Sequence, residues 1–473
     1  MRSTFRSTLL AAGLLVLLSA CEDTTRPDVV RVDQAPQYST IVNVTTTELG
    51  TLGGTRSQGI AINSLGQIAG SSKTAAGVLH AFMWDGTMHD LGTLGGVTGS
   101  SAWAVNDLGQ VIGSSGAVAR GEQHAFLWDG TMHDLGTLGG AYSEAVAING
   151  LGQVAGVSLT ATFDQHAFLW DGTMHDLGTL GEPGTMRVTD LNSMGHVVGF
   201  VINAFVGRAF LWDGTMRDLG TLGGAGSSAA WAINDLGQVV GSSQTASGEI
   251  HAFLWDGTMH DLGTLGGSTS SAGDVNGLGQ VTGISRTASG KTHSFLWDGT
   301  MHDLGTLGGS TAEAAAINDL GQVVGSSQTT SGETHAFLWD GTMHDLGAPD
   351  DGSSSASAIN DAGQVAGTIS TAAGVGSAVL WTVTIGIPGA VEALAAVTTA
   401  IVSAAFPVGT ERGLLATLDA AALQVQNGNV VAATQLLQAV INQVEAMVRS
   451  ARLPAEAGQA IIDAARAAIA ALG

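Results

Sequence analysis

Residues 251–267 read HAFLWDGTMHDLGTLGG, and close variants of this segment return along most of the chain. The tryptophan that ends its apolar part recurs at intervals of 42 to 44 residues, at Trp84, Trp128, Trp170, Trp212, Trp255, Trp297, Trp339 and Trp381. An asparagine shortly before a Gly-Gln or Gly-His pair recurs as often, at Asn63, Asn106, Asn149, Asn192, Asn234, Asn276, Asn318 and Asn360. A near-constant period of this length indicates a repeat architecture in which each copy forms one supersecondary unit.

Each copy has the pattern of four short β-strands. In the copy around Trp255 we expect strands at 230–233, 238–243, 251–255 and 258–265. Asp256-Gly257 has the composition of a two-residue type I′ hairpin, and Gly266-Gly267 is expected to end the fourth strand. The third strand has apolar residues at both its odd and its even positions, so apolar side chains lie on both of its faces. Both faces should therefore be buried, as they would be between two neighbouring blades. Four strands in about 42 residues predict one blade of a β-propeller.

The last copy is split between the two ends of the repeat region. After Trp381 it lacks the Asp-Gly hairpin and the Leu-Gly strand, whereas the repeats begin with an unpartnered strand at 41–54. We therefore expect the N-terminal strand to complete the last blade, which would close the ring and remove exposed strand edges. The predicted fold is an all-β, eight-bladed β-propeller over residues 40–385, with a parallel β-solenoid as the alternative.

The composition limits the classes of partner. The 473 residues include 16 Lys and Arg against 40 Asp and Glu, which gives a net charge of −24. Binding to nucleic acid needs a basic patch that this composition lacks, and an anionic membrane surface would repel the chain. Cys21 is the only cysteine, so no intrachain disulfide can form.

The N-terminus has the features of an export signal. Arg2 and Arg6 precede a short apolar run, and Leu18-Ser19-Ala20-Cys21 resembles a bacterial lipobox. We expect a lipoprotein signal peptide at 1–20, lipidation of Cys21, and a polar tether at 21–39 that links the folded chain to a membrane. An ordinary secretory signal cut after Ala20 is the alternative. Either interpretation places the protein outside the cytoplasm, and the lipid anchor would hold it in the bacterial cell envelope.

The last ninety residues change character. From Ala390 the chain is Ala-rich, and apolar residues with helical spacing run from Leu414 to Leu472. Gly428 and Asn429 should separate two helices, and Pro454 suits the first turn of another. The apolar stretch 390–406 is too short for a membrane span and reads as a packed helix. We expect a small all-helical domain at 386–473.

Two segments carry family resemblances. The His-Ala-Phe-Leu-Trp and Asp-Leu-Gly-Thr-Leu-Gly-Gly motifs resemble the HAF repeat of bacterial extracellular proteins, over about residues 40–385. That family implies secretion and tandem repetition without an established activity. The segment from Leu414 to Leu472 resembles the small helical FIMAH module of secreted bacterial proteins. Many HAF-repeat relatives end in a C-terminal sorting signal, which this sequence lacks, so the lipobox is the anchor that the sequence offers.

The histidines repeat with the copies, which favours a structural role. A hairpin at Asp256-Gly257 would set Phe253 opposite His260 and His251 opposite Leu262, so no two histidines of one copy would meet at ligand distance. No nucleophile elbow, phosphate loop, His-Glu-x-x-His motif or calcium loop occurs. We therefore expect no catalytic residue, no metal and no cofactor.

The fourth copy departs most from the pattern. Arg208 and Arg217 replace the two repeated histidines, His196 replaces the usual glutamine, and Arg187 follows the interruption at Glu182-Pro183. A local group of basic residues in an acidic protein suits an anionic sugar or carboxylate. Arg187, His196, Arg208 and Arg217 are thus candidate ligand-binding residues, and drift of one repeat is the alternative explanation.

Two classes of function remain. The first is a lipid-anchored, non-catalytic binding, adhesion or scaffold protein whose repeats contact a glycan or protein ligand. The second is a carbohydrate-active hydrolase or lyase with its site on one propeller face. The near-identity of the copies favours the first, because multivalent binding tolerates identical blades whereas catalysis needs asymmetry.

Overall fold

The computed structural model describes residues 40–117, 121–181, 184–386, 390–404, 410–426 and 430–472. The predicted signal peptide, Cys21 and the predicted tether lie outside the described residues, as do Gly428 and Asn429.

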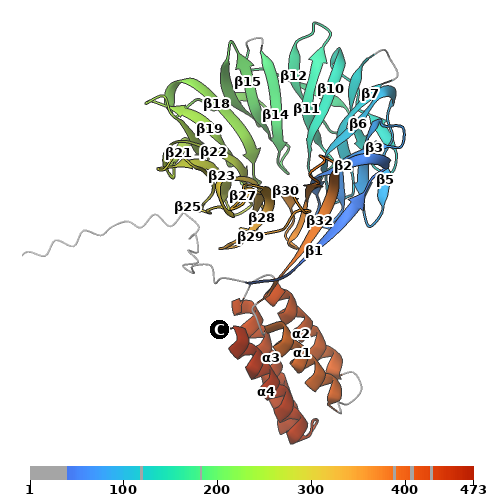
Figure 1. Ribbon diagram of the computed structural model, residues 1–473, viewed down its shortest axis with the longest axis vertical. Coiled ribbons are helices and arrows are strands. Elements are labelled where there is room, and N and C mark those ends of the chain that lie inside the picture. The colour runs from blue at the N-terminus through green and yellow to red at the C-terminus, as the bar shows by residue number, and fades with distance from the viewer. Residues whose placement is uncertain are drawn as a thin grey trace, which may run out of the picture. The chain divides into compact units, whose positions relative to one another are not determined.

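The described part of the chain up to Gly386 is mostly β, and its strands pair antiparallel in sets of four that lie around a centre (Figure 1). We number these sets as units. Unit 1 holds β2 (Gly53–Ile62), β3 (Ile68–Thr74), β4 (Leu79–Trp84) and β5 (Met88–Asp90); unit 2 holds β6 (Gly95–Val105), β7 (Val111–Ala117), β8 (Gln123–Trp128) and β9 (Met132–Asp134); unit 3 holds β10 (Gly139–Ile148), β11 (Val154–Thr160), β12 (Gln165–Trp170) and β13 (Met174–Gly178); unit 4 holds β14 (Thr185–Leu191), β15 (Val197–Asn203), β16 (Val206–Trp212) and β17 (Met216–Asp218). Unit 5 holds β18 (Gly223–Ile233), β19 (Val239–Thr245), β20 (Ile250–Trp255) and β21 (Met259–Gly263); unit 6 holds β22 (Gly266–Val275), β23 (Val281–Thr287), β24 (Thr292–Trp297) and β25 (Met301–Asp303); unit 7 holds β26 (Gly308–Ile317), β27 (Val323–Thr329), β28 (Thr334–Trp339) and β29 (Met343–Asp345).

Unit 8 joins the two ends of the repeat region. It holds β30 (Ser353–Ile359), β31 (Gln364–Ser370), β32 (Gly376–Gly386) and β1 (Thr40–Gly50). The N-terminal strand β1 pairs antiparallel with β32, from Thr40 opposite Gly386 to Gly50 opposite Ala378. The predicted pairing of this strand with the last copy is therefore confirmed. Antiparallel pairing within every unit is not the ladder of a parallel solenoid, so that alternative is wrong.

Neighbouring units pack face to face through small apolar cores. Each third strand contributes three consecutive buried residues, such as Ala252, Phe253 and Leu254 in β20, which confirms that both of its faces are covered. Unit 8 and unit 1 share a core of the same kind, in which Phe82 belongs to one cluster with Leu49 and Leu380. Single parallel bridges link some units, and no sheet closes on itself within the described ranges. The architecture is thus propeller-like, with four-stranded units stacked around an axis.

Two predictions about the strand ends are wrong. The hairpin after Trp255 has a three-residue loop, because Trp255 pairs with Met259 and the Asp256 amide donates to the Thr258 carbonyl at 3.2 Å. The third residue shifts the register by one, so Phe253 lies opposite Asp261 rather than His260. Gly266-Gly267 starts β22 of the next unit instead of ending a strand, because it pairs with the end of β23.

Within the described ranges after Gly386 there are four helices: α1 (Ala390–Ser403), α2 (Thr410–Gln426), α3 (Val430–Arg449) and α4 (Ala455–Leu472). Their buried faces form one apolar core that includes Leu418, Leu437, Val444 and Ile461. Pro454 directly precedes α4, where its missing N–H leaves no helical bond unmade. Within the described ranges, no helix has the length and apolar character that crossing a membrane requires.

Candidate functional site

The first strands of the units line a central channel, and the repeated asparagines tie them together. Each asparagine stands just after a first strand, is buried, and donates its Nδ2–H to the backbone carbonyl of the asparagine one unit further on, at 2.9 to 3.1 Å. The last one, Asn360, donates to the carbonyl of Asn63 at 3.0 Å. Because each buried amide is satisfied by the neighbouring unit, the turns are held in a ring around the axis.

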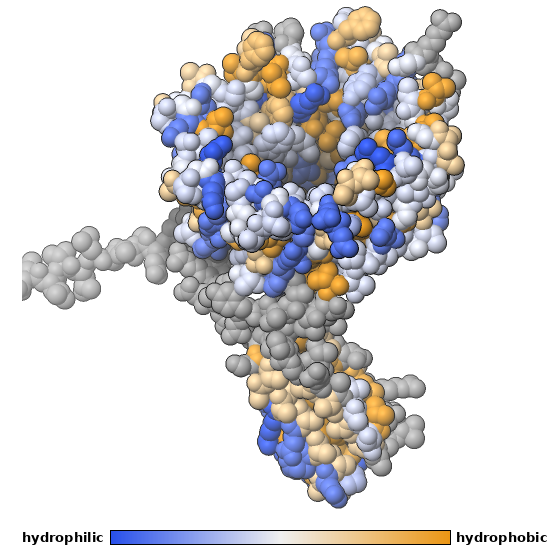
Figure 2. Space-filling view, viewed as in Figure 1, coloured by the Kyte–Doolittle hydropathy of each residue, from blue (hydrophilic) through white to orange (hydrophobic). Residues whose placement is uncertain are grey.

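Two cavities occupy this channel, whose opening is visible as a hollow in the space-filling view (Figure 2). The cavity at the asparagine end measures about 520 Å³ and is lined by the same three positions of every unit. Its lining includes Asp107, Asp235, Asp319 and Asp361 and no basic residue. The second cavity, of about 480 Å³, is lined mainly by first-strand residues of units 3 to 7. We call the second cavity the channel pocket.

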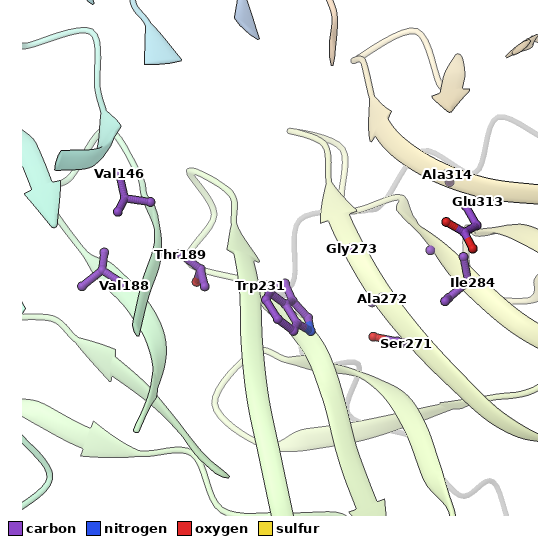
Figure 3. Close-up of a pocket in the computed structure, with 11 residues that line it drawn as sticks. Val146, Val188, Thr189, Trp231, Ser271, Ala272, Gly273, Ile284, Glu313 and Ala314 are labelled. Atoms are coloured by element: carbon purple, nitrogen blue, oxygen red, sulfur yellow. The ribbon is translucent and has the colours of Figure 1, made fainter. Parts of the chain in front are cut away.

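The channel pocket is built from positions at which the units differ. Trp231 on β18 is 40% exposed and lies between Val146, Val188 and Thr189 on one side and Ser271 and Glu313 on the other (Figure 3). The corresponding residue elsewhere is Ile60, Trp103, Val146, Thr189, Gly273, Ala315 or Ser357.

The Trp231 indole is held in place by an aromatic neighbour. It packs edge-on against Phe200, with ring centroids 5.2 Å apart and an interplanar angle of 67°. The pocket therefore combines a rigid aromatic surface, aliphatic walls and one carboxylate, that of Glu313, all within one cavity.

Two aspartates beside the channel stand where six units have alanine. Asp190 accepts the amide of Leu191 at 2.8 Å and that of Ile233, in the next unit, at 2.9 Å. Asp274 makes the same two bonds, to Val275 at 2.8 Å and to Ile317 at 3.0 Å. Burial raises the pKa of the Asp190 carboxyl to about 7, and burial also raises the pKa of Asp274. These carboxylates bridge neighbouring units, a role that the sequence did not reveal.

The four predicted ligand-binding residues do not form one site. Arg187 on β14 is exposed near Tyr142, whose hydroxyl donates to Glu144 at 2.6 Å. Arg208 lies two strands away on the other face of the same sheet, because Arg187 pairs with Phe200 and Phe200 with Ala209. His196 lies in the turn at the asparagine end, where its amide donates to Asn192 Oδ1 at 3.0 Å. Glu182, Pro183 and Cys21 lie outside the described residues.

Arg208 and Arg217 are paired with acids of their own unit. Arg208 donates to Asp218, and Arg217 Nε donates to Asp213 Oδ1 at 3.0 Å. Histidines make the equivalent contacts in the other units: His251 Nδ1 lies 2.9 Å from Asp261 and His260 Nε2 lies 2.8 Å from Asp256. The two arginines thus take the histidine positions, as expected, with their charges already balanced.

The histidine–aspartate pairs account for the repeated histidines. Twelve of the thirteen histidines contact an aspartate at 2.7 to 2.9 Å, and His196 is the exception. The hydrogen bond from the partner histidine lowers the pKa of Asp85, Asp129, Asp171 and Asp256. Among the described residues, no group of three or more His, Cys, Asp or Glu side chains could hold a metal ion.

Comparison with known proteins finds similarity among solved structures alone. No protein-family model matches it, and no curated protein matches it. Similar solved structures include the β-propeller domain of the Trilobed protease from Pyrococcus furiosus, at 11% identity and a TM-score of 0.43 over 63% of this chain and 99% of that chain. Pyrococcus horikoshii acylaminoacyl peptidase aligns at 12% identity and a TM-score of 0.40, over 66% and 58% of the two chains. Aleuria aurantia lectin aligns at 12% identity and a TM-score of 0.28, over 52% and 92%.

Proposed function

We propose that the chain is a closed, eight-bladed propeller of the HAF-repeat type with a FIMAH-like helical domain at 386–473, held at the bacterial cell envelope by a lipid on Cys21. The ring of asparagine hydrogen bonds supports closure, since the bond from Asn360 to Asn63 joins the last unit to the first. The pairing of β1 with β32 supports it independently. The lipobox-like segment supports the anchor and an extracytoplasmic location.

Its proposed role is non-catalytic binding of a glycan or protein ligand in the channel pocket. One observation carries this proposal: Trp231 is 40% exposed and lines a cavity of about 480 Å³, in a chain whose third and fourth strands recur with few changes. The repeat does not require a large aromatic side chain at this position, since most units have a smaller residue there. The Trp231 ring, held by Phe200, offers a ligand a preformed apolar surface. Glu313 would accept a hydrogen bond from a hydroxyl or amine of the ligand.

The chain contains a matched control for this site. Trp103 occupies the position of Trp231 in unit 2, is 41% exposed, and does not line the channel pocket. A panel of oligosaccharides and short peptides is screened against the full chain, and the best ligand is titrated against Trp231→Ala and Trp103→Ala. We expect Trp231→Ala to weaken binding at least tenfold and Trp103→Ala to leave it unchanged. Equal effects of the two substitutions would remove the channel pocket as the binding site.

A further inference from the structure

A third cavity lies on unit 3, outside the channel. It is at the end of the sheet opposite the asparagine turn. It measures about 500 Å³, and its walls include Phe163, Asp164, Gln165, His166 and Thr185. The first four residues belong to the turn between β11 and β12 and to the start of β12, and Thr185 starts β14 of the next unit. We call this cavity the rim pocket.

Phe163 occupies a backbone position that other units reserve for glycine. In five units the glycine at this turn has a positive φ and donates its amide to a threonine three residues earlier: Gly77, Gly248, Gly290, Gly332 and Gly374. Phe163 makes the same bond, to Thr160 at 3.0 Å, with a φ of 66°. A bulky side chain rarely adopts that conformation, and Phe163 is also 77% exposed, so neither backbone preference nor burial accounts for it. An exposed aromatic ring on a strained turn is therefore a feature that the fold itself does not require.

The polar groups of the rim pocket are open for a ligand. His166 Nδ1 lies 2.8 Å from Asp176, which fixes the ring, and Nε2 has no partner among the described residues. In units 2 and 5 the equivalent nitrogen is approached by a glutamate: His124 Nε2 lies 3.7 Å from Glu122. His251 Nε2 lies 3.9 Å from Glu249 in the same way. Unit 3 has the shorter Asp164 at this place, which leaves the imidazole uncovered.

Asp164 adds a carboxylate with spare capacity. Its Oδ2 accepts the Thr162 hydroxyl at 2.7 Å, while Oδ1 has no partner among the described residues. The pocket lining holds no lysine or arginine, so it offers an anionic ligand no charge partner. The open groups are thus an aromatic face, a carboxylate oxygen and an imidazole nitrogen, with a threonine hydroxyl at the edge.

We infer that the rim pocket binds a neutral sugar residue. The apolar C–H face of a pyranose ring would stack on Phe163, while its hydroxyls would donate to Asp164 Oδ1 and His166 Nε2. A volume of about 500 Å³ has room for one or two sugar rings. The rim pocket shares no lining residue with the channel pocket, so this inference does not depend on the function proposed above.

The test uses the full chain and the methyl glycosides of glucose, galactose, mannose and N-acetylglucosamine, titrated by saturation-transfer NMR up to about 10 mM. We expect at least one glycoside to bind. Phe163→Gly, which restores the glycine of the other turns, should reduce the affinity at least tenfold while the unfolding temperature stays equal or rises. His166→Asn and Asp164→Asn should each weaken binding severalfold.

Phe205 supplies the matched control. It lies at the equivalent turn of unit 4, has a φ of 73°, is 99% exposed, and does not line the rim pocket. Phe205→Gly should therefore leave the affinity unchanged. The inference is overturned if none of the four glycosides binds, if Phe163→Gly binds as tightly as the parent chain, or if Phe205→Gly loses as much affinity as Phe163→Gly.

Discussion

Asp190 makes the stability of the ring depend on pH in a direction opposite to that of an ordinary salt-bridged acid. Its carboxylate bridges unit 4 and unit 5 through the amides of Leu191 and Ile233, and burial raises its pKa from 3.8 to about 7. Because the folded-state pKa lies above the unfolded value, the stability from this group is present below about pH 4 and is lost as the pH rises to about 7. Asp190→Asn removes this titration.

The shift sets the size of the effect. The pKa of Asp190 is raised by about three units, and each unit corresponds to about 1.4 kcal/mol. Above pH 7 the ionised carboxylate therefore lowers the free energy of unfolding by about 4 kcal/mol. Asparagine has one acceptor oxygen, so the variant loses one of the two backbone hydrogen bonds, at about 1 kcal/mol at any pH. We expect Asp190→Asn to be slightly less stable than the parent at pH 4 and about 3 kcal/mol more stable at pH 8.

Chemical unfolding of the full chain at several pH values, followed by tryptophan fluorescence, measures this difference. Asp190→Ala serves as a control, because it restores the alanine of six other units and removes both acceptor oxygens. Its free energy of unfolding should depend on pH as that of Asp190→Asn does, and it should be lower than that of Asp190→Asn at every pH. A stability difference between Asp190→Asn and the parent that stays constant from pH 4 to pH 8 would refute the reasoning.

Three further predictions concern the ring and the anchor. Deletion of residues 40–54 removes the partner of β32, so we expect aggregation and a lower unfolding temperature by light scattering and calorimetry; a monomer with an unchanged midpoint would contradict closure. Asn234→Asp keeps the side-chain oxygen that caps its own turn but loses the donor to the Asn276 carbonyl, and should cost about 1 to 3 kcal/mol in thermal denaturation, whereas no loss would mean that the inter-unit bond is unimportant. Cys21→Ser should move the protein from the membrane pellet to the soluble fraction at an unchanged unfolding midpoint, and a variant that still pellets would require a different anchor.

The strands were predictable from the sequence because each copy repeats the same apolar and turn residues, which average out local ambiguity. The length of the loop after Trp255 was not predictable, because Asp256-Gly257 fits both a two-residue and a three-residue hairpin. The pairing of Trp255 with Met259 shows that the loop has three residues. That one-residue difference hid the pairing of His251 with Asp261, which lie ten residues apart.

The site depended on contacts between copies, which a period alone does not specify. The repeated asparagines have the sequence pattern of turn residues, and their bonds to the next unit depend on how the units pack around the axis, as in the bond from Asn234 to the Asn276 carbonyl. Arg208 and Arg217 stood out because they break the pattern, yet each is balanced by an aspartate of its own unit. Trp231 and Phe163 were identifiable as variations in the repeat, but their exposure and the φ of Phe163 are properties of the fold.

The central claim, that the channel pocket binds the ligand, is tested most directly by the indole N–H signals of the ten tryptophans in a nitrogen-15 NMR spectrum of the full chain. Trp231→Phe assigns one signal and Trp103→Phe another. Addition of the best ligand from the screen should shift or broaden the Trp231 signal while the Trp103 signal stays in place. A ligand that binds and leaves the Trp231 signal unmoved would contradict the claim.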